Sequence, residues 1–377
     1  MTKLAAVIAG ALVALAPGAR VLEDGPRGDL PRVDPPRPVT ERQDDLRPRA
    51  GYPRAKVEEA LQRGFAFLAS KESRLADGSW PVEDAASALR APIAVAALSS
   101  LALMAGGNLP DRGPHGERVR RGIEYLLARA VREDGDPRIG FMGGDGVSRM
   151  HGHGFATLAL AQAYAMSPDA PLGASLRETL VDAVALIERT QGAEGGWMYE
   201  PRLEAEHEGS VTVCLVSALR AARDAGILVD ARVVDRAEDY VRRSQAEDGR
   251  FRYTLGSDKR TLALTAAGIA TLEAAGSYDD PAVRRGLDVL LRELAAGTWE
   301  GQGEFPHYER YYVALALFGL PDREHFDRWF EDELLVLLAS QQENGSWNDS
   351  NYGSVYATAI NCLVLALPEG VLPIHQR

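Results

Sequence analysis

The chain has 377 residues, of which 46% are hydrophobic, and its formal net charge is -12. This length and apolar content suffice for one large domain or two ordinary ones. The acidic balance and the lack of a long basic run argue against a nucleic-acid partner, because phosphate binding needs a basic surface.

Residues 1–19 are typical of a secretory signal. Lys3 gives a positive start, residues 4–16 are apolar, and Gly18 and Ala19 are small. The apolar run is too short to span a bilayer comfortably, and the alternative is an uncleaved membrane tether. We therefore expect an exported protein, periplasmic or secreted, whose N-terminal segment brings it close to a membrane if that segment stays attached.

Residues 20–53 are rich in proline, arginine and aspartate and have almost no apolar periodicity. Such a composition cannot build a core and is typical of a linker. The pattern changes at residue 54, so we expect one folded domain over residues 54–377.

From residue 54 onward, helical patterns alternate with short turns, and no segment sustains the period-two alternation of a strand. One set of predicted helices is amphipathic, as in an outer layer; it comprises 55–71, 117–130, 175–191, 231–245, 281–295 and 325–341. The other set is apolar nearly all round, as in helices buried on every side; it comprises 87–105, 154–166, 210–226, 260–276, 309–319 and 353–367. The sequence thus predicts an all-α fold, an (α/α)6 barrel of six outer and six inner helices.

A short motif recurs between the two kinds of helix. In its fullest copy Gln341 ends an outer helix, Gly345 follows in an acidic turn, and Trp347 comes next but one. Weaker copies begin at Lys71, Gln191 and Gln245. Glycine accepts the left-handed conformation that stops a helix, and the glutamine amide is expected to satisfy backbone groups at a neighbouring helix end. Repeats of roughly 40–60 residues indicate stacked helix pairs.

These glutamine-to-Gly-x-Trp repeats resemble those of squalene and oxidosqualene cyclases and of protein prenyltransferase β subunits, the α/α-toroid superfamily. The resemblance covers residues 55–372. The stretch from Tyr352 to Ile374 looks like the last repeat of exported bacterial proteins of this kind, whose activity is largely unassigned. The resemblance implies the toroid fold, whereas a shared fold by itself says little about chemistry.

Because every connection repeats, the N-termini of the inner helices should gather on one rim, where their dipoles favour an anionic group. Basic residues precede or begin most inner helices: Arg90, Arg149, His151, His153, His207, Lys259, Arg260, His307 and Arg310. The sequence therefore suggests a shared anion or polar-ligand site on this rim. The alternative is that these residues are solvated loop charges.

His151 and His153 are the densest polar pair, and His207 or Glu208 could join them around a metal ion. No carboxylate or thiolate spacing completes a recognisable ligand set. The alternative is that the two histidines form hydrogen bonds in the wall of the pocket. We therefore expect neither a metal ion nor a cofactor.

The resemblance carries over to only some residues. The stretch from Glu204 to Cys214 is similar to the start of the prenyltransferase inner helix whose histidine contacts the lipid diphosphate, which implies that role for His207, one position out of register. Asp258 matches that family's zinc aspartate. Arg260 stands where the family has its zinc cysteine, so the resemblance does not imply zinc here.

The general-acid motif of the cyclases, Asp-x-Asp-Asp, does not occur in the sequence. Its role is to keep one acid protonated beside other carboxylates. The nearest acidic pairs are Glu83-Asp84 and Asp279-Asp280, and both are typical of helix caps. The resemblance therefore supplies no catalytic residue.

Five tyrosines lie at the starts of the last two inner helices: Tyr308, Tyr311, Tyr312, Tyr352 and Tyr356. A helix turns 100° per residue, so some of these rings must point inward. Aromatic rings that face a cavity stabilise carbocations or stack on sugars. The alternative is that they are core residues with a hydrated hydroxyl.

The only cysteines, Cys214 and Cys362, fall in apolar helices three repeats apart in a ring of six. They should lie on opposite walls, too far apart for a disulfide, whose Cα atoms lie within roughly 7 Å. We expect two free, buried thiols.

Three functions remain open. An apolar cavity with a polar rim and aromatic lining suits an isoprenoid or similar amphiphile, bound with or without chemical conversion. A saccharide-active (α/α)6 lyase or hydrolase is the second reading, although sugar clefts favour tryptophans and paired acids. A non-catalytic interaction scaffold is the third, and the missing catalytic motifs favour it.

Overall fold

The structure is a computed structural model that describes residues 53–70, 73–169, 171–296 and 304–376. The predicted signal segment lies outside these residues, and so does the predicted linker apart from Pro53. The predicted helical domain is therefore the part of the chain whose structure is described.

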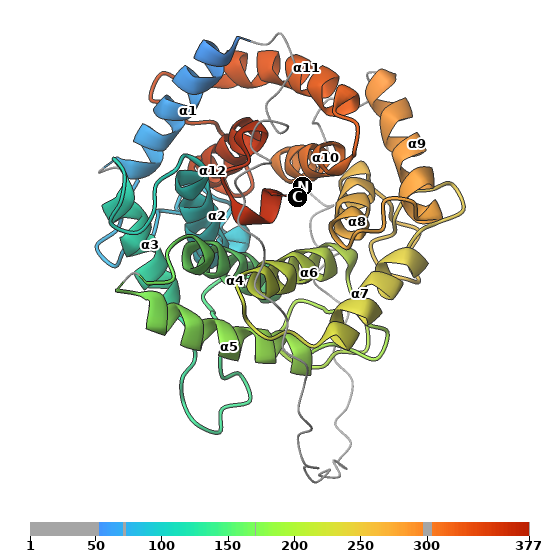
Figure 1. The fold of residues 1–377 in the computed structure, drawn as a ribbon, viewed down its shortest axis with the longest axis horizontal. Helices are drawn as coiled ribbons and strands as arrows, with labels where there is room; N and C mark the ends of the chain where they lie inside the picture. Colours follow the sequence, from blue (N-terminus) through green and yellow to red (C-terminus); the bar gives the residue numbers. More distant parts are fainter. Residues whose placement is uncertain (1–52, 71–72, 170, 297–303, 377) are drawn as a thin grey trace. The chain divides into compact units, whose positions relative to one another are not determined.

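The described residues form twelve α-helices in two concentric rings (Figure 1). The outer ring comprises α1 (Arg54–Ala69), α3 (Gly116–Ala128), α5 (Gly173–Arg189), α7 (Ala231–Arg243), α9 (Pro281–Ala295) and α11 (Glu324–Ser340). The inner ring comprises α2 (Pro92–Ala105), α4 (Arg149–Met166), α6 (Gly209–Asp224), α8 (Leu262–Ala274), α10 (Pro306–Gly319) and α12 (Gly353–Ala366). Each inner helix packs on the next, and α12 packs on α2, so the inner ring is closed. The predicted (α/α)6 architecture is confirmed.

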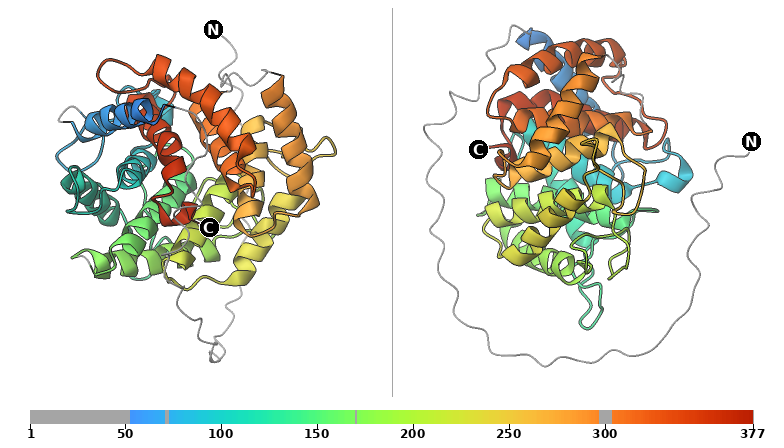
Figure 2. Two further views of the ribbon diagram at one scale, coloured as in Figure 1. Left: turned by 45° about the horizontal axis from the view of Figure 1, so that its top comes forward. Right: turned by 90° about the vertical axis from the view of Figure 1, so that its right-hand side faces the viewer.

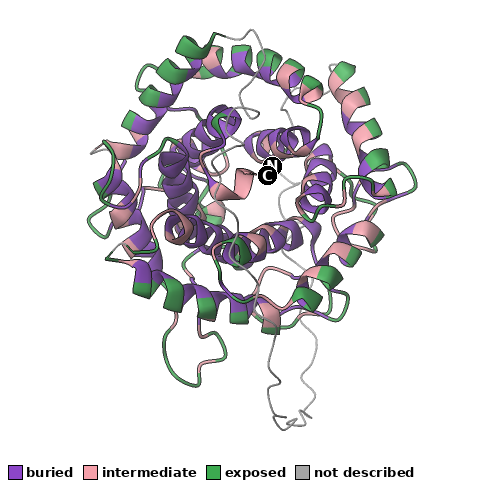
Figure 3. Cartoon of the chain, in the orientation of Figure 1, coloured by how far each residue is buried: buried purple, intermediate pink, exposed green. Residues whose placement is uncertain are grey.

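Burial follows the apolar pattern of each ring (Figure 3). In the outer helix α7 only Val233, Ala237, Tyr240 and Val241 are buried, a spacing that forms one stripe along a helix. The inner helix α2 buries every residue from Val95 to Ala105, because it is covered on all sides. The contrast is the physical reason why the sequence separates the two rings.

Three inner helices begin three or more residues away from the expected start. The predicted helix 87–105 is interrupted, since Ser87–Leu89 is a short 3-10 helix (η1) and α2 starts at Pro92. The residue before a proline is disfavoured in helical conformation, and proline suits the first helical position. Helix α4 starts at Arg149 and α10 at Pro306, earlier than predicted, so His151 and His153 lie on the helix itself.

The recurring motif is the joint between neighbouring repeats. Gln341 Nε2 donates to the carbonyl oxygens of Gly345 (3.0 Å) and of Ala60 in α1 (2.9 Å), while Trp347 Nε1 donates to Leu337 in α11 (2.9 Å). The Gln191 amide likewise joins its own turn to α7, and the Gln245 amide joins its turn to α9. The last joint therefore ties α11 to α1 and closes the outer ring.

In the first repeat Lys71 lies outside the described residues, and an arginine from the next helix completes the joint. The Arg118 guanidinium lies 3.2 Å from the centre of the Trp80 ring and donates to the Gly78 carbonyl oxygen (2.8 Å). The first repeat thus has the aromatic residue of the motif, Trp80, and the side chain that hydrogen-bonds to its turn is Arg118 of α3.

The two cysteines are free and buried, Cys214 on α6 and Cys362 on α12, as expected. These helices stand three positions apart in the inner ring, which explains why the thiols do not meet. None of the helices in the described ranges is long and apolar enough to cross a membrane.

Candidate functional site

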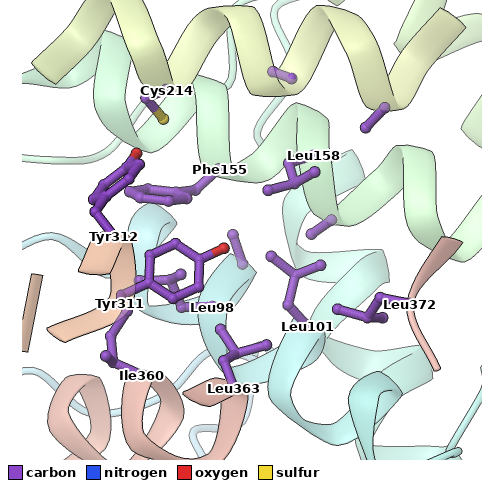
Figure 4. Close-up of a cluster of buried hydrophobic side chains, with 14 of the residues drawn as sticks. Leu98, Leu101, Phe155, Leu158, Cys214, Tyr311, Tyr312, Ile360, Leu363 and Leu372 are labelled. Atoms are coloured by element: carbon purple, nitrogen blue, oxygen red, sulfur yellow. The ribbon is translucent and has the colours of Figure 1, made fainter. Parts of the chain in front are cut away.

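The interior of the inner ring is largely filled by side chains that point toward one another (Figure 4). Leu98 and Leu101 come from α2, Phe155 and Leu158 from α4, and Leu363 from α12. All are at most 7% exposed. The centre of the toroid is therefore an apolar core and not an open channel.

A cavity of about 100 Å³ lies at the C-terminal ends of α6, α8 and α10. It is partly open to solvent, since Tyr278 in its wall is 41% exposed. Its wall includes Tyr311, Tyr312 and Leu315 of α10 and Leu158 of α4. Burial raises the pKa of both tyrosines, so their hydroxyls stay protonated and polar. Tyr311 and Tyr312 are thus the two predicted site residues that line this cavity.

The chain's own C-terminal segment closes one side of the cavity. After α12 the chain forms a 3-10 helix (η2, Leu367–Glu369), turns at Gly370, and ends in a second one (η3, Pro373–His375). In Figure 1 and in the left view of Figure 2, the red C-terminal segment lies in the opening of the inner ring. Ile374, His375 and Gln376 line the cavity.

Arg220 of α6 also lines the cavity and is held loosely. Its side chain is 25% exposed, and its nearest carboxylate, Asp224, lies 3.9 Å away. Partial burial lowers the pKa of Arg220, and burial together with the neighbouring guanidinium lowers the pKa of His375 to about 4. The cavity therefore has an apolar, aromatic side, one cationic group, Arg220, and one carboxyl group, Glu273.

The opposite rim holds the N-termini of the inner helices, where an anion site was expected. Several of these ends already carry a carboxylate of the chain itself. Asp145 accepts from the Ile93 N–H at the start of α2 (2.7 Å), and Glu208 accepts from the Val211 N–H in α6 (2.7 Å). Asp84 accepts from the Ser354 N–H in α12 (2.7 Å), so the predicted cap caps a helix far away in the sequence. These carboxylates occupy the positions that an anionic ligand would need.

The two buried caps are perturbed by their surroundings. Burial raises the pKa of Asp145 to about 7 and also raises the pKa of Glu208, although backbone N–H groups partly offset both shifts. The Glu208 carboxyl group lies close to the joined hydroxyls of Tyr199 and Tyr253, and burial together with this carboxyl raises the pKa of both tyrosines. Of the three capping carboxylates, only Asp84 was predicted as a cap from the sequence.

Three basic residues at this rim are exposed and paired with acids. Arg149 lies 3.2 Å from Glu200 and Lys259 lies 3.6 Å from Glu304, while Arg260 lies 3.5 Å from Asp248. Arg90 and Asp258 are exposed as well. This arrangement corresponds to the alternative of solvated loop charges.

His151 and His153 point in different directions, because residues two positions apart along a helix are rotated by about 200° around its axis. The His151 ring lies 6.5 Å from the ring of Tyr308, which comes from α10 on the other side of the ring. His153 is fully buried between α4 and α5, where Nδ1 accepts from the Met142 N–H (3.3 Å) and Nε2 faces the Ala183 carbonyl oxygen (3.4 Å). The structure does not bring the two imidazoles together.

His207 precedes α6 and faces the outer ring. Its Nε2 faces the Glu204 carbonyl oxygen (3.2 Å), and its ring lies edge-on to Tyr240 of α7 at 5.9 Å. Gly192 packs against the imidazole so closely that a Cβ there would overlap with it. His207 therefore sits in the joint between two repeats. In the described part of the chain, no group of three or more His, Cys, Asp or Glu residues could hold a metal ion.

His307 and Arg310 belong to a buried network between α10, α11 and α12. His307 Nε2 faces the Asn348 carbonyl oxygen (3.1 Å), and Arg310 Nη1 lies 3.0 Å from His307 Nδ1. Arg310 also forms an ion pair with Glu333 of α11, whose side chain is 2% exposed. Both residues therefore hold the wall together and do not reach the cavity.

The remaining predicted tyrosines form an aromatic layer near the N-terminal rim. The Tyr308 and Tyr312 rings are 4.6 Å apart, and the Tyr352 and Tyr356 rings are 4.9 Å apart. The Tyr356 ring also lies edge-on to His307 at 6.3 Å. Of the predicted residues, the structure thus gathers the tyrosines and His151 in the interior and places the others elsewhere.

Sequence reasoning missed Arg220, Gln162 and the C-terminal segment. One signal was available for Gln162, a polar residue within the mostly apolar stretch 158–166 of α4, whereas Arg220 is followed by Arg223 and Asp224 and does not stand out in the sequence. The return of the C-terminal segment into the ring has no local signal, since it depends on where α12 ends in space.

We expect the fully buried His153 to make the domain less stable in acid. Burial lowers the pKa of His153 from 6.5 to about 4. Between these pH values the unfolded chain binds a proton that the folded chain does not, so the free energy of unfolding falls as the pH falls. A shift of this size corresponds to about 3 kcal/mol. Urea unfolding between pH 7 and pH 4 measures it.

His153→Gln should show a smaller loss of stability over this window, and His325→Gln on the outer helix α11 is the matched control. His151 and His375, whose pKa values burial also lowers to about 4, should contribute to the rest of the loss. If His153→Gln keeps the full pH dependence of the parent, His153 is not a neutral buried group.

The sequence matches no protein-family model and no curated protein. Among solved structures, the type II terpene cyclase MstE from Scytonema is similar, with a TM-score of 0.56 and 18% identity over 85% of this chain and 100% of that chain. A D-mannose isomerase has a TM-score of 0.59 and 13% identity over 84% of this chain and 99% of that chain. An α-1,6-mannanase variant of Salegentibacter sp. HEL1_6, solved with α-1,6-mannotriose, has a TM-score of 0.57 and 11% identity over 84% of this chain and 99% of that chain. The chain thus has the (α/α)6 toroid fold, similar to a terpene cyclase, a sugar isomerase and a mannanase.

Proposed function

We propose that this protein binds an isoprenoid or a similar amphiphilic small molecule in the interior of the toroid. The observation that carries the proposal is the character of the cavity wall, in which Leu158, Tyr311, Tyr312, Leu315 and Phe318 present apolar and aromatic surface. Burial of such surface is the main driving force for binding a hydrocarbon chain. The proposal concerns binding, and we assign no chemical conversion.

The terpene cyclase provides support from its fold. One structure of it, with a TM-score of 0.54 to this chain, was solved with geranylgeranyl dihydroxybenzoate as substrate. A saccharide site is less well supported by the cavity itself. Among the described residues that line it, Glu273 is the only carboxylate, whereas glycoside hydrolysis needs a pair of acids.

Isothermal titration calorimetry with geranylgeraniol and with mannose tests the proposal. We expect geranylgeraniol to bind and mannose not to bind. Ala270→Phe should fill the cavity, which Ala270 lines on α8, and weaken geranylgeraniol binding at least about tenfold, or about 1.4 kcal/mol. Ala231→Phe, at the exposed start of α7, is the matched control and should bind as the parent does.

Organic extraction of the purified protein followed by mass spectrometry gives a second readout, in which we expect a co-purifying amphiphile. Mannose binding that Ala270→Phe abolishes would replace the proposal by the saccharide reading. If neither compound binds to the parent or to a chain that lacks residues 371–377, the scaffold reading stands.

A further inference from the structure

The cavity is small for the ligand class proposed above. Its volume of about 100 Å³ is below the roughly 300–1,000 Å³ of pockets that hold small molecules. A long hydrocarbon chain needs more room, and the space next to the cavity is filled by the chain's own C-terminal segment, residues 371–376. Leu372 points into the interior beside Leu101 and Leu363 (Figure 4).

Few polar contacts hold this segment in place. Among the described residues, one hydrogen bond joins it to the inner helices, from the Ile374 N–H to Gln162 Oε1 of α4 (3.0 Å). The other hydrogen bonds of the segment stay within residues 370–376. Gln162 is fully buried, and its Nε2 has no hydrogen-bond partner in the described part of the chain. With the segment in place, the donor group of the Gln162 side chain therefore remains without a partner among the described residues.

The segment also has a defined pivot. Gly370 follows η2 with φ 58°, and the chain turns there into the ring. Residues other than glycine rarely adopt this left-handed backbone conformation. The body of the toroid ends before this point, since α12 and η2 are complete at Glu369. Residues 371–376 can therefore move about Gly370 without breaking an inner helix.

Arg220 lies next to the segment and lacks a close partner. No hydrogen bond to its guanidinium is formed within the described residues, and its single ion pair is the long one to Asp224. Arginine suits carboxylate and phosphate because its planar group donates two parallel hydrogen bonds. In a chain with a net charge of -12, a half-buried cation beside an apolar cavity is a specific feature.

From these observations we propose that residues 371–376 are a displaceable plug over the ligand site, and that Arg220 binds the anionic group of an amphiphile once the plug leaves. This inference rests on the proposed function, which it deepens by naming the head group and the entrance. The head lies at the C-terminal ends of the inner helices, opposite to the rim that the sequence suggested. The hydrocarbon chain takes the space of Leu372 and Ile374 and the cavity beyond.

Binding of geranylgeranyl phosphate, geranylgeranoic acid and geranylgeraniol tests the plug, because the three differ in the head group. We expect a chain that lacks residues 371–377 to bind all three at least tenfold more tightly than the full chain. Gln162→Leu weakens the plug without a deletion, because it leaves the Ile374 N–H unpaired only in the closed state. It should shift affinity in the same direction, and circular dichroism checks that both proteins are folded.

Arg220→Gln, made in the truncated chain, tests the head group. It should weaken binding of the phosphate and the acid at least tenfold and leave the alcohol unchanged; loss of only one anion assigns the site to that anion. Hydrogen exchange should show faster exchange of residues 371–376 in the full chain when the phosphate is added.

The outcomes separate the two proposals. If the full chain, the truncated chain and Gln162→Leu bind the alcohol equally, the plug is refuted while the proposed function stands. If Arg220→Gln weakens all three compounds alike, Arg220 does not select an anionic head. If no form of the protein binds any of the three, both proposals fail.

Discussion

Arg310→Met is expected to lower the free energy of unfolding by about 3–5 kcal/mol, the cost of leaving one member of a buried ion pair without its partner. Arg310 pairs with Glu333, and their side chains are 8% and 2% exposed. Burial already raises the pKa of Glu333 while the guanidinium opposes that shift. Without Arg310 the carboxyl must either remain charged in the core or take up a proton. Urea unfolding at pH 7 measures the loss.

The double variant Arg310→Met, Glu333→Leu is the control, because it removes both charges and keeps similar volume. Replacing a buried ion pair by apolar residues is often close to neutral, so most of the lost stability should return. A double variant as unstable as Arg310→Met would mean that the ion pair is not the reason for the loss. Ligand binding should be unaffected by the double variant, since neither residue lines the cavity.

Gly345→Ala is expected to cost about 2–5 kcal/mol in unfolding free energy and to loosen the closure of the outer ring. The backbone of Gly345 has φ 89°, which costs an alanine about 1–2 kcal/mol. The new Cβ would also overlap with the Arg63 carbonyl oxygen of α1, and such overpacking costs about 1–3 kcal/mol. Urea unfolding measures the total.

Gly226→Ala separates the two contributions. Gly226 has φ 83°, and a Cβ built there meets nothing within 4 Å. This control should lose only the conformational share of about 1–2 kcal/mol. Equal losses for Gly345→Ala and Gly226→Ala would show that the close approach of the last turn to α1 does not contribute.

The twelve helices could be predicted because their signal is local. An amphipathic stripe and an all-round apolar pattern are properties of neighbouring residues, and copies of the motif at Gln341 mark four of the six passages from outer to inner helix. The residues at which the helices start were harder to predict from the sequence. Helix α4 begins at Arg149, five residues before the predicted start, and this moved His151 and His153 from a loop onto a helix.

That shift explains much of what sequence reasoning could not predict about the site. Two histidines in a loop can face the same ligand, whereas two residues apart on a helix they face opposite sides. Thus His151 points to Tyr308, and His153 points to the Ala183 carbonyl oxygen in α5. The candidate tyrosines were easier, because several consecutive aromatic residues on one helix must include some that face inward.

The all-helical fold, its two layers and the joints between repeats could therefore be predicted, since each depends on residues close together along the chain. The tertiary structure alone decided which charges are already paired, as with Asp84, which caps α12 from the other end of the chain. It also decided where the interior is open. Arg220 on α6 and Ile374 near the C-terminus meet at one cavity only because the closed ring brings the last residues back to its centre.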